Sequence, residues 1–281
     1  MTLERSKQII IGLSIAVVLL LISNFSALRK LDLATRFSEP PSEAVEESSK
    51  VIKEEEVTKP IAGTIVLVID DFGYRNDAVS DGFLKLNVPI TCAIIPGHSQ
   101  SKYFAEKAIE AGQEVIIHMP MESTVNTPGE DEYKLLAGMT SEEIEWRINE
   151  VLKEIPQALG MNNHQGSKVT TNGKVMSVIG SVLKAKNKYF IDSRTAANTV
   201  GEETMRHLGV PTARRHVFLD NDSSIELISE QMDILVDLAR KNGMAVGIGH
   251  AKLNTLEVLK TQIPVLLNAG FKFQFASQIV N

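Results

Sequence analysis

Acids and imidazoles recur at one kind of place in this sequence, the residue or two that follow an apolar run. The run TIVLVIDDFG, residues 64–73, ends in two adjacent carboxylates, Asp70 and Asp71. Aspartate and histidine donors without cysteine are the ligand set of a divalent cation such as zinc. A cation would also explain the adjacent acids, because it stabilises one carboxylate while the other stays ionised as a base. The polar residues that follow the later runs are His98, His118, His164, Asp192 with Ser193 and Arg194, Asp220 with Asp222, and His250.

Taken one at a time, these residues have ordinary structural explanations. A histidine at a strand end is more often a hydrogen-bonded polar residue than a ligand, and we interpret His98 in that way. His207 and His216 fall within helical and strand-like stretches and are expected to be structural. The repetition at successive strand ends favours a shared site over separate structural roles. The sequence contains no GxGxxG or P-loop motif, so no nucleotide is expected as cofactor or partner.

The elements that must position these residues alternate along the chain from Thr64 onward. Between the apolar runs lie segments whose apolar residues are three and four apart, as in amphipathic helices. One segment begins with Thr140 and Glu143, which form a capping box, and another opens on Ser223 and closes at Gly243. The runs typical of buried strands are TIVLVID, ITCAIIP, EVIIHM, KYFID, RHVFLD, AVGIGH and FKFQFA, with a weaker candidate at LGMNNH.

This alternation predicts a parallel α/β domain. The number and size of its units suit a (β/α) barrel with seven or eight parallel strands better than an open doubly wound sheet, which is the alternative. All strands of a parallel barrel point the same way, so the residues that follow them converge on the carboxyl-terminal mouth, where catalysis usually takes place in such folds.

Composition excludes several classes of protein. The chain has 281 residues, of which 43% are hydrophobic and 23% charged, as expected of a globular domain with one large core or two small ones. Its net charge of -6 and the lack of a long basic block argue against a nucleic-acid partner. The single cysteine, Cys92, excludes an intrachain disulfide and a cysteine-based zinc cluster.

The N-terminal part of the chain differs from the rest. Residues 9–25 carry no charge and are close to the length that spans a bilayer, so residues 1–30 are expected to be a signal peptide or membrane anchor. We favour an uncleaved anchor, because no clean A-x-A cleavage pattern follows. Residues 31–60 are rich in Glu, Ser and Pro and are expected to form a flexible acidic linker before a domain at 61–281. The protein is thus expected to be exported, either membrane-anchored on the extracytoplasmic side or secreted.

Six motifs, in the order VIDDFG, HMPME, NNHQGS, FIDSRT, RHVFLDN and GIGH, resemble the divergent branch of the polysaccharide deacetylases. The resemblance extends from Thr64 to the end of the chain. It implies a distorted (β/α) barrel and metal-dependent removal of N- or O-acetyl groups from sugars. Its substrate would be an acetylated polysaccharide or cell-wall glycan, and its metal most simply Zn²⁺.

The resemblance also implies roles for individual residues. Asp70 matches the general base and His250 the general acid of the family. Asp71 and His118 match metal ligands, and Glu122 stands where the main family has a second histidine. His164, in NNHQGS, is expected as the compensating ligand. The three residues expected to orient the site or bind the substrate are Asp192, Arg194 and Asp220.

Two other functions remain open at this stage. A metal-free glycoside hydrolase could use Asp70 with Asp192 or Asp220 as its two carboxylates, although that mechanism has no need of a histidine cluster. A non-catalytic carbohydrate or cell-wall binding module could share the same fold. Aromatic residues make up only 5% of the chain, which gives binding alone little support.

Overall fold

A computed structural model describes residues 61–125 and 129–281. The expected signal peptide or anchor at 1–30 and the acidic linker at 31–60 lie outside these residues. Within the described ranges, no helix is both long and apolar enough to cross a bilayer.

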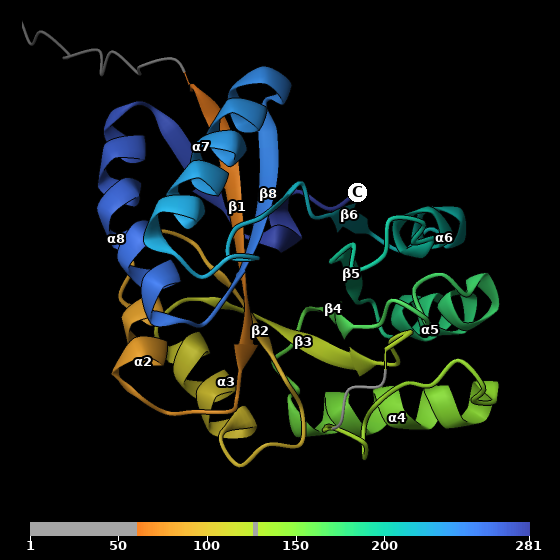
Figure 1. Ribbon diagram of the computed structural model, residues 1–281. Helices are drawn as coiled ribbons and strands as arrows, with labels where there is room; N and C mark the ends of the chain where they lie inside the picture. The colour runs from red at the N-terminus through yellow and green to blue at the C-terminus, as the bar shows by residue number, and fades with distance from the viewer. Residues whose placement is uncertain (1–60, 126–128) are drawn as a thin grey trace, which may run out of the picture. The chain divides into compact units, whose positions relative to one another are not determined.

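The described chain folds into strands that alternate with helices (Figure 1). The strands are β1 Gly63–Phe72, β2 Thr91–Ile94, β3 Glu114–Met121, β4 Gly160–Gln165, β5 Tyr189–Asp192, β6 Thr212–Arg214, β7 Val217–Phe218, β8 Met244–His250 and β9 Phe271–Gln274. The helices are α2 Ala78–Leu84, α3 Ser101–Glu110, α4 Ser141–Glu154, α5 Gly173–Ala185, α6 Gly201–Leu208, α7 Ile225–Asn242 and α8 Leu253–Asn268, followed by the 3-10 turn η1 Ala276–Gln278.

All pairings between the strands are parallel, and their order is β6-β5-β4-β3-β2-β1-β8-β7. β9 pairs with the first half of β1, while β2 pairs with its second half. The described residues thus form nine strands, against the seven or eight expected. The additional strand is β6, a segment of three residues that is too short to show an apolar pattern.

The sheet curls into a distorted (β/α) barrel that is open between β6 and β7. Only Arg215 and His216 join these two strands, so the chain crosses the opening there. The amide of Arg215 donates to the carbonyl of Asp192 on β5 (2.9 Å), and the amide of His216 donates to the carbonyl of Val246 on β8 (2.9 Å). This crossing therefore links the two ends of the sheet.

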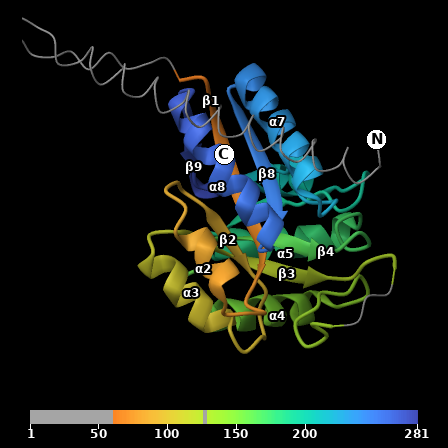
Figure 2. The same cartoon turned by 60° about the vertical axis from the view of Figure 1, so that its left-hand side comes forward.

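Helices cover the outside of the curled sheet, with α4, α5 and α6 along one flank and α7, α8, α2 and α3 along the other (Figures 1 and 2). Their ends agree closely with the sequence patterns. Thr140 and Glu143 form the expected capping box at α4, and Gly243 ends α7 with a left-handed φ of 82°. The N-cap of α7 is Ser224 rather than the expected Ser223, because the Ser224 hydroxyl accepts the Leu227 amide.

Strand residues divide between two cores. On β1, Ile65, Leu67 and Ile69 pack outward against the helices, and Val66 and Val68 pack inside the barrel. This follows from the two-residue period of a strand. The inner core is small, and its other fully or nearly buried members are Ala93, Ile116, Tyr189, Ile191, Ala213, Val246, Ile248 and Ala276.

The C-terminal segment closes the end of the barrel where the strands begin. Glu114, at the start of β3, accepts hydrogen bonds from the hydroxyls of Thr91 (2.9 Å) and Tyr189 (2.7 Å) and from the amide of Ser277 (3.2 Å). The amide of Ala276 donates to the Thr91 hydroxyl (2.9 Å). With this end filled, the polar residues at the carboxyl ends of the strands surround the opposite, accessible mouth.

Candidate metal and active site

The end of β1 brings both acids of the Asp70–Asp71 pair to the same site. Asp70 continues the inward series of Val66 and Val68, so its carboxylate faces the barrel mouth. A neighbouring residue in a regular strand would point the opposite way. Here, however, the register with β2 shifts between Ile69 and Phe72, and Asp71 has a φ of 67°. This left-handed conformation, which costs on the order of 1–3 kcal/mol, turns Asp71 toward the same histidine as Asp70.

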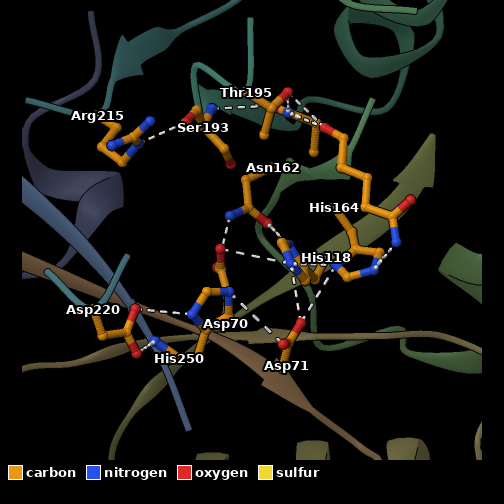
Figure 3. Close-up of polar contacts among 12 residues, drawn as sticks. Asp70, Asp71, His118, Asn162, His164, Ser193, Thr195, Arg215, Asp220 and His250 are labelled. Carbon is orange, nitrogen blue, oxygen red and sulfur yellow. Dashed lines mark hydrogen bonds and ion pairs between the residues drawn. The ribbon is translucent and has the colours of Figure 1, made fainter. Parts of the chain in front are cut away.

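Three nitrogen and oxygen donors converge beside this bulge (Figure 3). Asp71 Oδ1 lies 3.4 Å from His118 Nε2 and 3.4 Å from His164 Nδ1, and the two nitrogens lie 3.0 Å apart. These atoms all fall within 4.8 Å of one another. Asp71 Oδ1 is buried and has no hydrogen-bond partner, which is costly for a carboxylate oxygen unless a ligand satisfies it. The donor set and this unsatisfied oxygen fit a divalent cation such as zinc.

Asn162 connects the candidate ligands to Asp70. Parallel pairing places Asn162 beside His118, and Figure 3 shows it between His118 and Asp70. Its Oδ1 lies 2.7 Å from His118 Nδ1, and its Nδ2 donates to Asp70 Oδ1 (2.8 Å). Since the amide oxygen can only accept, His118 carries its proton on Nδ1 and leaves Nε2 free to bind a metal. Such a partner behind a ligating histidine fixes its tautomer and orientation.

His250 lies on the neighbouring strand β8, in register with Asp70. Its Nδ1 lies 2.8 Å from Asp220 Oδ1, and its Nε2 lies 3.8 Å from Asp71 Oδ2. Asp220 Oδ2 accepts the backbone amide of His250 (2.8 Å) and the hydroxyl of Thr255 (2.8 Å). The fully buried Asp220 carboxylate therefore orients the ring and directs Nε2 into the site.

The two acids of the pair have opposite electrostatic environments. Burial raises the pKa of Asp70, more than His118, His250 and Asn162 lower it. Burial also acts on Asp71, but the imidazoles of His118 and His164, each 3.4 Å from Oδ1, outweigh it and hold the pKa of that carboxyl far below its usual range. Asp71 is thus ionised and suited to bind a cation, whereas Asp70 has the higher proton affinity that a general base requires.

The pKa of His250 is raised. Burial disfavours the charged ring, but the hydrogen bond and charge of Asp220, with further contributions from Asp71 and Asp70, more than offset it. A histidine whose charged form is stabilised in this way can act as a proton donor near neutral pH.

A pocket of about 370 Å³ opens over this cluster. Asp70, His118, His164 and His250 line one part of it, and Figure 3 places Ser193, Thr195 and Arg215 across from them. The remaining lining residues are Asn163, Gln165, Arg194, Phe218, Asn221 and Ile248. Like Asp71, two of these residues, Gln165 and Arg194, have left-handed φ values of 55° and 51°. Strained backbone of this kind is concentrated at functional sites.

The structure does not bring Glu122 into the group of candidate ligands. Its carboxylate pairs with Lys168 (2.6 Å) and accepts the amide of Ala137 (2.8 Å). Glu122 lies just after the end of β3, beyond the strand residues that face the barrel. The third donor comes instead from β4, where His164 lies next to Pro120 in the register.

Asp192 does not line the pocket either, because it follows Ile191, which faces the inside of the barrel. Its side chain therefore points outward, where it accepts the amide of Arg194 (2.8 Å), the hydroxyl of Thr199 (2.9 Å) and the amide of Glu202 (3.1 Å). It holds the loop after β5 and the start of α6, which is an orienting role and excludes direct contact with a ligand. Arg194 does line the pocket.

The histidines expected to be structural lie outside the cluster. His98 packs against Tyr74 with ring centroids 4.2 Å apart, and His216 Nδ1 accepts the amide of Val246 (3.0 Å). Asn162, Arg215 and Phe218 also belong to the site and were not predicted from the sequence. Asn162 lies two residues before His164 on one strand, so the two-residue period could have identified it. Arg215 and Phe218 had no such signal, because the crossing between β6 and β7 was not foreseen.

Fold and site together define a barrel with a candidate metal centre at the carboxyl ends of its strands. The chain belongs to the divergent polysaccharide deacetylase family, whose model matches residues 67–280. This confirms the family expected from the six motifs.

The similar proteins found by sequence comparison are uncharacterized. YibQ of Escherichia coli K12 is 37% identical over 203 residues, which is 72% of this chain and 63% of YibQ. A protein of Haemophilus influenzae is 33% identical over 198 residues, covering 70% of this chain and 69% of its own length. Among solved structures, uncharacterized protein ATU2773 of Agrobacterium tumefaciens C58 superposes with a TM-score of 0.73 at 18% identity, over 78% of this chain and 90% of that one. This last likeness shows the fold alone.

Proposed function

We propose that this protein is a metal-dependent hydrolase that removes acetyl groups from a polysaccharide. The observation that carries the proposal is the meeting of Asp71, His118 and His164 within 4.8 Å, with both histidines lining one pocket together with Asp70 and His250. Family membership supports a carbohydrate substrate. Asp71, His118 and His164 would hold the metal, which when bound supplies Lewis acidity toward the acetyl carbonyl and acidifies water.

The protein's own residues would divide the proton transfers between them. Asp70 is buried and its pKa is raised by that burial, and in its ionised form it would take a proton from the attacking water. Asn162 holds one oxygen of that carboxylate at 2.8 Å, which leaves Oδ2 to act as the base. The Nδ1–H of His250 donates a hydrogen bond to Asp220, which stabilises the protonated ring. In that form Nε2 also carries a proton, which would pass to the departing amine or alkoxide. The two residues would thus act on opposite halves of one hydrolysis.

The geometry gives less support to a metal-free glycoside hydrolase. That mechanism needs a second free carboxylate facing the substrate together with Asp70. Asp192 is committed to the loop and helix that follow it, and Asp220 to His250 and Thr255.

Release of acetate from an N-acetylated chitooligosaccharide and from acetylated xylan tests the proposal and separates N- from O-deacetylation. We expect turnover with zinc, its loss on chelation, and a loss in His118→Ala. His207→Ala, an exposed histidine on α6, is the matched control and should retain turnover. Undiminished turnover in metal-free protein would refute metal dependence, and failure to hydrolyse any acetylated glycan would favour a binding module.

We also propose that the domain acts outside the cytoplasm. The support is the uncharged stretch at residues 9–25, with the acidic stretch that follows at 31–60. A periplasmic or extracellular reporter fused after residue 281 should be active with the full chain and inactive when residues 1–30 are deleted. Equal activity of the two fusions would contradict export through this segment.

A further inference from the structure

Two arginines, Arg194 and Arg215, line the pocket, and the proposed hydrolysis gives neither of them a specific partner. Arg215 lies on the crossing between β6 and β7, and its guanidinium donates from Nε to the Ser193 carbonyl (2.6 Å) and from Nη2 to the Arg194 carbonyl (3.0 Å). The same group lies over the ring of Phe218, 4.6 Å from its centroid. These contacts hold the half-buried cation in one orientation at the pocket wall.

Arg194 reaches the pocket from the loop after β5. Asp192 Oδ1 accepts its amide (2.8 Å) and so supports the left-handed backbone that turns this residue. Burial lowers the pKa of Arg215, and the charge of Arg194 lowers it further, which means that the two cations are close enough to repel. The strained, left-handed backbone of Arg194 therefore accompanies two like charges held near each other.

Neither cation is neutralised by a nearby acid. Among the residues that the structure describes, no carboxylate oxygen lies within 4.0 Å of either guanidinium, although Asp70 and Asp192 attract Arg215 from farther away. By contrast Arg214, the preceding residue on β6, pairs with Glu202 at 3.4 Å. Two adjacent cations at a partly desolvated wall are unfavourable unless a ligand brings negative charge.

The donors that remain free define the chemistry of such a ligand. A guanidinium has five N–H donors in a planar fork, and Arg215 uses two of them for carbonyls. The rest, with those of Arg194, match the paired oxygens of a carboxylate or phosphate. Phe218 and Ile248 add an apolar surface in the same pocket, against which the body of a sugar can pack.

We propose that Arg194 and Arg215 bind an anionic substituent of the substrate, so that the site selects an acetylated sugar bearing a carboxylate or phosphate over its neutral counterpart. This inference rests on the proposed carbohydrate function and narrows it to acidic saccharides. The shared chemistry is an oxyanion attached to the sugar, and the probes below distinguish its two sources.

Calorimetric binding to metal-free protein tests selection without requiring turnover. The three probes are N-acetylglucosamine, N-acetylmuramic acid, which adds a carboxylate, and N-acetylglucosamine 6-phosphate. We expect at least one acidic sugar to bind about ten- to a hundredfold more tightly than the neutral sugar, as charge-assisted hydrogen bonds provide. The favoured acidic probe identifies the carboxylate or the phosphate as the recognised group.

Two variants connect that preference to the pocket. Arg194→Gln should abolish the preference, and Arg194→Lys should retain part of it. Arg214→Gln removes the same charge nearby and should leave the preference intact. Equal affinity for the three sugars, a preference that survives in Arg194→Gln, or no measurable binding of either acidic sugar would overturn the inference.

The outcome is separable from that of the deacetylase proposal. A charge preference that depends on Arg194, without release of acetate from any substrate, would uphold acidic-sugar recognition and refute hydrolysis. Release of acetate from neutral glycans without any such preference would uphold hydrolysis and refute acidic-sugar recognition.

Discussion

Replacing Asp220 with asparagine should lower the pKa of His250. The Asp220 carboxylate is fully buried and its Oδ1 lies 2.8 Å from His250 Nδ1, so it stabilises the charged ring at close range. Asparagine keeps the shape and an oxygen able to accept the His250 amide, but it removes the charge. Burial disfavours the charged ring, and without the Asp220 charge less remains to offset that effect, so the pKa of His250 falls.

The magnitude follows from the type of hydrogen bond that is lost. A hydrogen bond to a charged group contributes about 1.5–3 kcal/mol. Since one pH unit corresponds to about 1.4 kcal/mol, the pKa of His250 should fall by about one to two pH units. Under the proposed function, the fraction of protonated His250 at neutral pH would fall with it. The high-pH limb of the activity profile should then move to lower pH.

An NMR titration of the His250 ring in chelator-treated protein measures this pKa directly and does not depend on turnover. Asp222→Asn is the matched control, because this exposed acid accepts the local amide of Ser224 and should leave the titration unchanged when it is replaced. A His250 pKa that is the same in Asp220→Asn as in the parent chain would refute the assigned role of Asp220.

Three further substitutions test other parts of the site. Asn162→Leu removes the partner of His118 Nδ1 and should weaken zinc binding by about ten- to a hundredfold in competition with a chromogenic chelator. In the same assay Glu122→Gln should leave zinc affinity unchanged, and a loss of comparable size would restore Glu122 as a ligand. Asp192→Ala leaves the partly buried amides of Arg194 and Glu202 without their acceptor, so urea unfolding should show a loss of about 1–3 kcal/mol in stability. Unaltered stability would contradict the structural role of Asp192.

Much of the architecture could be predicted from the sequence because most strands that carry the site are strongly apolar. The LGMNNH segment forms β4 and contributes His164, as expected from its place in the alternation of strand-like and helical segments. β6 was not predicted, because three residues carry no periodicity. The crossing at Arg215 depends on how the two ends of the sheet meet, which is a tertiary property that local pattern does not encode.

The site was predictable where strand period alone decides which way a side chain points. Asp70 and His250 both continue inward series, so they meet at the mouth. Ile191 faces the inside of the barrel, so the same rule predicts that the next residue, Asp192, points away from the pocket. Asp71 breaks the rule, since only the shifted register and its left-handed φ bring it to the ligand cluster. Glu122 was expected as a ligand from the family resemblance, but it follows the last residue of β3 and its carboxylate pairs with Lys168.

The central claim is that Asp71, His118 and His164 bind one metal ion together. Elemental analysis of zinc-equilibrated, desalted protein tests it most directly, with Asp71→Asn, His118→Ala and His164→Ala beside His207→Ala as the control. The account predicts close to one equivalent of zinc in the parent and the control, and a large loss in each of the three site variants. Zinc retained in full by all three site variants, or absent from the parent protein, would contradict it.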